Sequence, residues 1–134
     1  MPTGSDVAYF DTSALVKLVL TEAESAALQE AVGSWPRRAT SRLSVVELIR
    51  TVHRADPDRE EDARSLLTGL TLLNDSDRTL ATAARIEHST LRALDAIHVA
   101  SAHRIRSSLS NFVSYDRRQL EAAEALGLPT SSPR

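Results

Sequence analysis

Short apolar runs typical of buried strands alternate with amphipathic helical segments along this chain of 134 residues. Val7–Phe10 is such a run, and Leu15, Leu18 and Val19 follow it at the i, i+3 and i+4 spacing of a helix that faces a core. Because the alternation continues to the end of the chain, the sequence predicts an α/β fold with a mostly parallel sheet covered by helices on both faces.

The strands are expected where β-formers cluster between turn residues. They are Val7–Phe10, a short strand around Arg38–Thr40, Leu70–Leu73, Asn111–Tyr115 and a last edge strand within GLPTSS. No repeat or linker interrupts the chain, so we expect one domain over residues 1–134, with a core of about 7–129 and a short frayed tail at 130–134.

The helices are expected where apolar residues repeat at helical spacing between residues that begin or end a helix. They are Ser13–Leu20, a segment from Thr21 to near Gly33, Leu43–Arg54, Arg59–Leu67, Asp77–Ile86, Asp95–Arg106 and Gln119–Leu126. Glu24 stands at a capping-box position of the second helix, ADPD breaks the chain before the fourth, and Gly127 is the expected C-cap of the last.

Composition excludes several classes of protein. The chain has no cysteine, which removes disulfides, thiolate zinc sites and cysteine nucleophiles, and it has no apolar run of the ~20 residues that a membrane span needs. The N-terminus lacks the order of a signal peptide, so we expect a cytoplasmic protein. With 16 basic and 18 acidic residues the net charge is −2, which neither favours nor excludes a phosphate-containing substrate.

Four carboxylates stand at junctions between expected strands and helices. Asp11 follows the first strand, Glu47 lies in the first turn of a helix, Asp95 opens the segment DAIHVASAHRIR, and Asp116 follows the strand in NFVSY. Each has a local explanation: Asp11, Asp95 and Asp116 can cap helices, and SVVE matches a capping box that would pair Glu47 with Ser44. Taken singly, these positions do not require a function.

Their combination points to a metal site. Strand C-termini and the starts of the following helices share one edge of a parallel sheet, which is where such sheets place ligands. Several carboxylates brought within a few ångströms repel one another unless a cation compensates them, and Mg²⁺, for which Mn²⁺ can substitute, is the ion that carboxylates and water bind. Such a site can activate water and neutralise a phosphodiester oxygen.

Other polar residues add less. Hydroxyls at Thr12, Ser13 and Ser114 lie beside two of the acids and can orient water or phosphate, or cap helices. His98, one turn after Asp95, is expected to pack between helix and sheet more than to serve the site. Neither a glycine-rich phosphate loop nor a G-x-S-x-G elbow occurs, and the arginine pairs are as consistent with solvated surface as with a nucleic-acid backbone.

Four blocks of the sequence resemble PIN-domain ribonucleases, and more narrowly the VapC-type toxins of type II toxin–antitoxin systems. The blocks are VAYFDTSALVKLVL, SRLSVVELIR, LRALDAIHVASAHRI and NFVSYDRRQLEAAEALGLP. The resemblance implies an α/β/α sandwich and a Mg²⁺-dependent endoribonuclease that cuts structured RNA of the tRNA or rRNA class and so inhibits translation and growth. It also implies a homodimer neutralised by a cognate VapB-type antitoxin.

The acidic site of that family falls on Asp11, Glu47, Asp95 and Asp116, and Ser114 falls beside the last acid. Many members have a further acid at the position of Arg118, so the resemblance leaves open whether one or two metal ions bind. Two alternatives remain at this stage. One is a Mg²⁺-dependent phosphatase with Asp11 as nucleophile, although Ser13 stands where its second acid belongs; the other is a non-catalytic module whose acidic edge receives an arginine-bearing partner.

Overall fold

A computed structural model describes residues 5–134, so the first four residues of the expected domain lie outside the described part of the chain. Five parallel strands form one sheet in the order β3-β2-β1-β4-β5. Their bounds are β1 Val7–Phe10, β2 Arg37–Ser41, β3 Thr71–Leu73, β4 Leu109–Val113 and β5 Thr130–Ser131. The predicted α/β class with a parallel sheet is confirmed.

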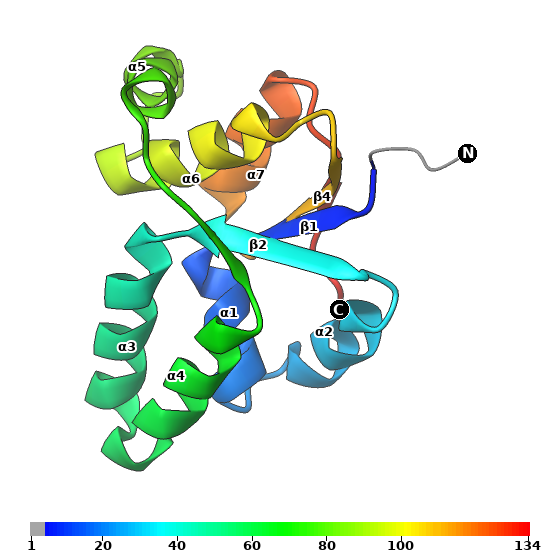
Figure 1. Cartoon of the computed structure of the whole chain (residues 1–134), viewed down its shortest axis with the longest axis vertical. Coiled ribbons are helices and arrows are strands. Elements are labelled where there is room, and N and C mark those ends of the chain that lie inside the picture. The colour runs from blue at the N-terminus through cyan, green and yellow to red at the C-terminus, as the bar shows by residue number, and fades with distance from the viewer. Residues whose placement is uncertain (1–4) are drawn as a thin grey trace.

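Seven α-helices and one 3-10 helix among residues 5–134 connect the strands. They are α1 Thr12–Val19, α2 Ser25–Val32, α3 Leu43–Ala55, the 3-10 turn Pro57–Arg59, α4 Glu60–Thr68, α5 Asp77–Arg85, α6 Ala93–Arg104 and α7 Arg117–Ala125. Figure 1 shows α1–α4 on one side of the sheet and α5–α7 on the other, which gives the three layers of the expected sandwich. No helix in this part of the chain is long and apolar enough to cross a membrane.

Each face of the sheet has its own apolar core because successive strand side chains point to opposite faces. Phe10 of β1 packs with α1–α4, and the ring of Trp35 meets it edge to face at 5.7 Å between centroids. Tyr9 faces the other way, stacking on Phe112 at 5.6 Å in the core beneath α6 and α7. The central strand is therefore fully buried, as the continuous apolar run VAYF predicts.

Several element boundaries and the tail differ from the sequence-based expectation, most boundaries by one or two residues. Helix α2 begins at Ser25 rather than Thr21, and the Glu24 carboxylate makes no cap hydrogen bond but pairs with Lys17 at 2.8 Å. Helix α6 begins at Ala93 rather than Asp95, because the Asp95 carboxylate accepts the backbone N–H of Arg92 and so lies within the first turn. Strand β4 ends at Val113 rather than Tyr115. The tail is not frayed: β5 pairs with β4, and the Ser132 hydroxyl donates to the Ser114 carbonyl at 2.5 Å.

Candidate active site

The strand order places a topological switch point of the sheet between β1 and β4. The chain leaves β1 toward β2 and β3 on one side and later returns to β4 on the other. Ligands of open α/β sheets bind at the carboxyl ends of the strands at such a point. Asp11 directly follows β1, and Ser114 and Asp116 follow β4, which places all three at this edge.

Asp11 is held by a complete set of donors. The hydroxyl of Ser13 donates to its two oxygens at 2.7 and 2.9 Å, Ser114 donates to Oδ2 at 2.7 Å, and the Ala14 N–H donates to Oδ1 at 3.0 Å. Both serine oxygens in turn accept backbone N–H groups, Ser13 from Tyr115 and Ser114 from Asp116. Because those acceptor positions are filled, the hydroxyl protons are turned toward Asp11.

The Asp11 carboxylate combines burial with stabilising contacts. Its side chain is 1% exposed, and desolvation raises the pKa of Asp11 above its ordinary value. The field of His98 and the hydrogen bonds from Ser13, Ser114 and Ala14 oppose that rise without cancelling it. Asp11 also caps α1, as its position after β1 suggested, while Ser13 serves the carboxylate rather than the helix. Asp11 is therefore a rigid potential ligand for a cation, and its hydrogen bonds compensate only part of the cost of burying its charge.

Glu47 belongs to a second network that crosses the sheet. Its Oε1 accepts from the Thr12 hydroxyl at 2.6 Å and from His98 Nε2 at 2.7 Å. Tyr9 accepts the Ser41 N–H, and its hydroxyl lies 2.8 Å from His98 Nδ1. The His98 ring is therefore held between Tyr9 and Glu47.

This network keeps Glu47 ionised. Partial burial raises the pKa of Glu47, but the hydrogen bonds from His98 and Thr12 and the field of His98 prevail, and the pKa is lowered overall. The capping box proposed for SVVE is wrong: Ser44 instead lies 2.6 Å from the Thr40 hydroxyl and is itself fully buried. His98 packs between helix and sheet, as expected, and it also contacts a site acid.

The third group contains Asp95 and Asp116, with Arg118 between them. The Arg118 guanidinium lies 3.3 Å from Asp116 Oδ2 and 3.9 Å from Asp95 Oδ2. Asp116 also caps α7 through the N–H groups of Arg118 and Gln119. The Gln119 amide donates to Asp95 Oδ1 at 3.0 Å. Arg118 thus supplies a positive charge beside both acids.

The four predicted acids lie along one edge, but in separately hydrogen-bonded groups. Among residues 5–134, no three His, Cys, Asp or Glu side chains gather closely enough to hold one metal ion. The expected convergence of three or four carboxylates is therefore not met, because each acid has its own donors: two serines for Asp11, Thr12 and His98 for Glu47, and Arg118 for the other pair.

The donor chemistry still fits Mg²⁺. This ion binds through one or two carboxylates and retains several waters, so it does not need a three-acid cage. Gln119 supplies an independent observation: its side chain is 4% exposed, and its buried Oε1 has no hydrogen-bond partner in the described part of the chain. A neutral carbonyl-type oxygen left unpaired beside Asp95 is a suitable acceptor for a metal-bound water.

Three residues of this region were not identified from the sequence. Tyr9 orients His98, Gln119 positions Asp95, and Asp75 joins the β3–α5 loop to the hydroxyls of Ser41 and Ser101 at 3.0 and 3.3 Å. The only sequence signal is at Gln119, which stands three residues after Asp116, the spacing of a capping box. Tyr9 and Asp75 act across the sheet, so local spacing does not reveal them.

Comparison with known proteins agrees with this fold. The sequence matches the PIN domain family over residues 8–125. It is 42% identical over 130 residues to Ribonuclease VapC47 of Mycobacterium tuberculosis, covering 93% of this chain and 96% of that protein. It is 35% identical over 125 residues to Ribonuclease VapC46 of the same species, with the same coverage. The crystal structure of Mycobacterium tuberculosis VapC20, a sarcin–ricin loop cleaving toxin, superposes with a TM-score of 0.75 at 17% identity, covering 94% of this chain and 99% of that one.

The fold and the site together define the class of this protein, which is an α/β sandwich with carboxylates at the switch point of its sheet. This chain belongs to the PIN domain family, in its VapC group.

Proposed function

We propose that this protein is a metal-dependent endoribonuclease toxin that hydrolyses phosphodiester bonds in structured RNA and is neutralised by a cognate antitoxin. One observation carries the proposal. Asp11 is buried at the β1–β4 switch point, where it accepts hydrogen bonds from three groups, and a second acid, Asp116, follows β4. The relatives named as VapC ribonucleases support the reaction class. Inhibition of translation by cutting tRNA or rRNA is part of the proposal.

The residues divide the work as follows. Asp11, Asp95 and Asp116 would hold Mg²⁺ or Mn²⁺, directly or through water, with Glu47 completing the set. When bound, the ion lowers the pKa of water and neutralises charge on the phosphodiester. Glu47, kept ionised by Thr12 and His98, accepts a proton from the attacking water, because its second oxygen, Oε2, makes no hydrogen bond within residues 5–134 and remains available.

Arg118 and the hydroxyls have positioning roles in this proposal. Ser13 and Ser114 fix the rotamer of Asp11, and Thr12 fixes that of Glu47. Arg118 stands 38% exposed over Asp95 and Asp116, where its guanidinium can also contact a scissile phosphate. A second metal ion would have to displace this guanidinium, so we propose that the active site binds one metal ion.

Two features of the surface, the acidic edge and a pair of exposed apolar side chains, indicate which partners the protein binds. An acidic edge suits an arginine-bearing antitoxin segment of the VapB type. A toxin–antitoxin complex from Klebsiella pneumoniae has the same fold, with a TM-score of 0.72 at 23% identity. Exposed apolar side chains, Leu80 at 44% and Leu94 at 48%, lie on neighbouring α5 and α6 and support a homodimer. We propose that these assemblies form in the cytoplasm.

The test uses the purified chain, free of antitoxin, with structured RNA and Mn²⁺ or Mg²⁺. We expect cleavage that EDTA abolishes, and Asp11→Asn should reduce it by about 100-fold or more, since a metal ligand is removed while the fold remains. Asp58→Asn, an exposed acid outside the site, is the matched control and should leave cleavage unchanged. Full, EDTA-sensitive cleavage by Asp11→Asn would contradict the assignment, and sequencing of the RNA ends identifies the target.

The two alternatives have less support. Both oxygens of Asp11 accept hydrogen bonds, and Ser13 occupies the second acid position of the usual phosphatase signature, so Asp11 is poorly suited to act as a nucleophile. Trapping an aspartyl phosphate would revive that hypothesis. Calorimetry that detects no Mn²⁺ binding by the antitoxin-free chain would instead favour a non-catalytic acidic edge.

A further inference from the structure

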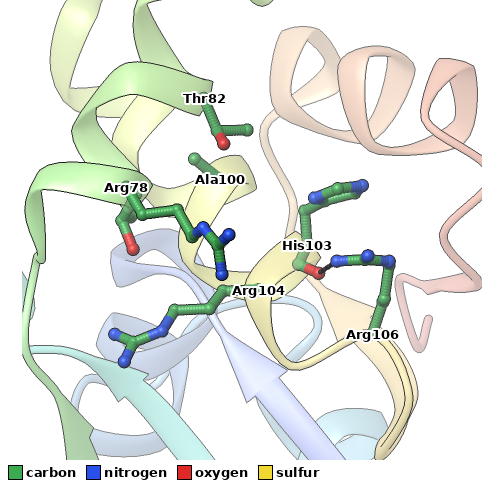
Figure 2. A pocket seen from close by; sticks show the side chains of 7 residues that line it. Arg78, Thr82, Ala100, His103, Arg104 and Arg106 are labelled. Carbon is green, nitrogen blue, oxygen red and sulfur yellow. Dashed lines mark hydrogen bonds between the residues drawn. The ribbon is translucent and has the colours of Figure 1, made fainter.

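A cavity of about 500 Å³ lies between α5 and the C-terminal half of α6, away from the acidic edge. Figure 2 shows that Arg78 and Thr82 border it from α5, whereas His103, Arg104 and Arg106 border it from α6 and the turn after it. No Asp or Glu among the described residues lines this cavity, which we call the arginine pocket. In a chain with a net charge of −2, three arginines without an acid form a local positive site.

The polar groups of the arginine pocket are only partly used by the protein. Arg104 donates to the Asn74 carbonyl at 3.0 Å, and Arg106 donates to the His103 carbonyl at 3.0 Å. No hydrogen bond or ion pair within the described chain involves the guanidinium of Arg78, the hydroxyl of Thr82 or the ring of His103. In Figure 2 these three side chains border one open space. The pocket therefore presents donors that are free to bind a ligand.

Helix energetics explain some of these cations but not Arg78. Arg104 and Arg106 lie at the C-terminal end of α6, where a positive charge is favourable to the helix dipole. Arg78 instead lies in the first turn of α5, where the dipole disfavours it. Its position is not accounted for by its own helix, so a ligand of opposite charge is the more direct explanation.

The environment of His103 disfavours the charged form of its imidazole. Burial lowers the pKa of His103, and the nearby charge of Arg106 lowers it further. A bound dianion would reverse the second effect, because it would stabilise the imidazolium form. Arginine forks, a hydroxyl and an imidazole together match the several acceptor oxygens of a phosphate group.

We propose that the arginine pocket binds a backbone phosphate of the RNA substrate, at a distance from the acidic edge; this inference rests on the proposed function. His103 follows Asp95 by eight residues on the same helix, which corresponds to about 12 Å along the axis. One straight helix thus fixes the distance between an anchored phosphate and the acids.

The positive surface extends beyond the pocket. Arg104 also lines an adjoining cavity of about 240 Å³, to which Arg37 and Arg38 contribute. These side chains come from β2, so the basic surface continues from α5 across the end of α6 toward the sheet. A polyanion such as RNA can use this continuity, whereas a single free phosphate needs only the arginine pocket.

The first experiment measures binding without catalysis. Inorganic phosphate is titrated into the whole chain while the imidazole signals of His103 are followed by NMR, with His103→Gln used for assignment. We expect a saturable shift and a raised pKa of His103, and Arg78→Gln should weaken phosphate binding by about tenfold. Arg85→Gln, which removes the same charge from the other end of α5, is the matched control and should change binding by less than about twofold. A His103 signal that phosphate does not move would overturn the proposal.

The second experiment uses bulk transfer RNA and the chain carrying Asp11→Asn, so that binding is measured without cleavage. Adding Arg78→Gln should reduce the slope of log affinity against log salt by about 1, and adding Arg85→Gln should leave it unchanged. If Arg78→Gln weakens binding of polyglutamate but leaves the RNA slope unchanged, the pocket serves an acidic protein and the RNA assignment is wrong. If phosphate still shifts the His103 signal but the chain cuts no RNA, the proposed function is overturned and phosphate binding by the pocket is not.

Discussion

At the acidic edge Asp11 is buried and accepts hydrogen bonds from three groups, whereas in the arginine pocket Arg78 is exposed and has no partner within the described chain. The first charge is oriented by the fold before any ligand arrives, and the second is left free. A side chain at the acidic edge thus contributes both to stability and to chemistry, while a side chain in the pocket contributes mainly to binding. Substitutions can separate these two contributions.

The largest expected stability effect is at Ser114, which links β4 to the acid on β1. Ser114→Ala removes a donor at 2.7 Å from Asp11 and the acceptor of the Asp116 N–H. We expect the free energy of unfolding to fall by about 2–3 kcal/mol, because one of these bonds is made to a buried charge. Thr82→Val in the arginine pocket should change it by less than about 0.5 kcal/mol. Urea denaturation of both variants measures the contrast, and equal effects would remove the distinction.

Tyr9→Phe is expected to have the next largest effect. The ring remains packed on Phe112, but the Ser41 N–H and His98 Nδ1 lose their partner. We expect a loss of about 1–2 kcal/mol and, because His98 is no longer anchored beside Glu47, a weaker RNase activity at unchanged RNA affinity. Cleavage rates at saturating RNA, compared with RNA binding, check this result. A variant with wild-type stability and rate would show that the Tyr9–His98 link is not functional.

The pH dependence of stability should differ between the two buried networks in metal-free protein. The pKa of Asp11 is raised on folding, so its contribution is greatest at low pH and is lost as pH rises from about 4 through the raised pKa. The pKa of Glu47 is lowered, so its contribution is present above about pH 4.3 and is lost as pH falls through the folded value.

Two variants separate these contributions. Relative to wild type, Asp11→Asn should become progressively more stable as pH rises above about 4, and Glu47→Gln progressively less stable as pH rises toward about 4.3. Urea denaturation in EDTA at each pH gives both curves. Differences from wild type that do not vary with pH would contradict the opposite pKa shifts of the two acids.

The smallest expected effect concerns Arg118. Arg118→Ala removes the guanidinium that lies 3.3 Å from Asp116 and 3.9 Å from Asp95, so Mn²⁺ affinity should rise by about two- to fivefold, the range expected for partly exposed ion pairs. Arg117→Ala, one residue earlier and 91% exposed, is the matched control and should leave affinity unchanged. Calorimetry gives both affinity and stoichiometry, and a decrease with Arg118→Ala would show that Arg118 does not oppose the ion.

Much of this architecture is predictable from local pattern. The run VAYF and the helical spacing after it lie within one residue of β1 and α1, and the position of Asp11 after β1 is confirmed. The predictions for α6 and β4 are shifted by two residues, because a cap between Arg92 and Asp95 begins α6 and the long-range hydrogen bond of Ser114 to Asp11 follows the end of β4. The roles of the four acids as metal ligands stay predictions.

The sequence by itself determined the α/β class, the place of each acid at an element boundary and the family, because periodicity and short motifs depend on neighbouring residues. Only the tertiary structure decided that Glu47 pairs with His98 rather than Ser44, that Arg118 lies between Asp95 and Asp116, and that Arg78 faces the end of α6. These contacts depend on which strands and helices lie side by side. That order is set by long-range packing in the sheet β3-β2-β1-β4-β5, which no local segment encodes.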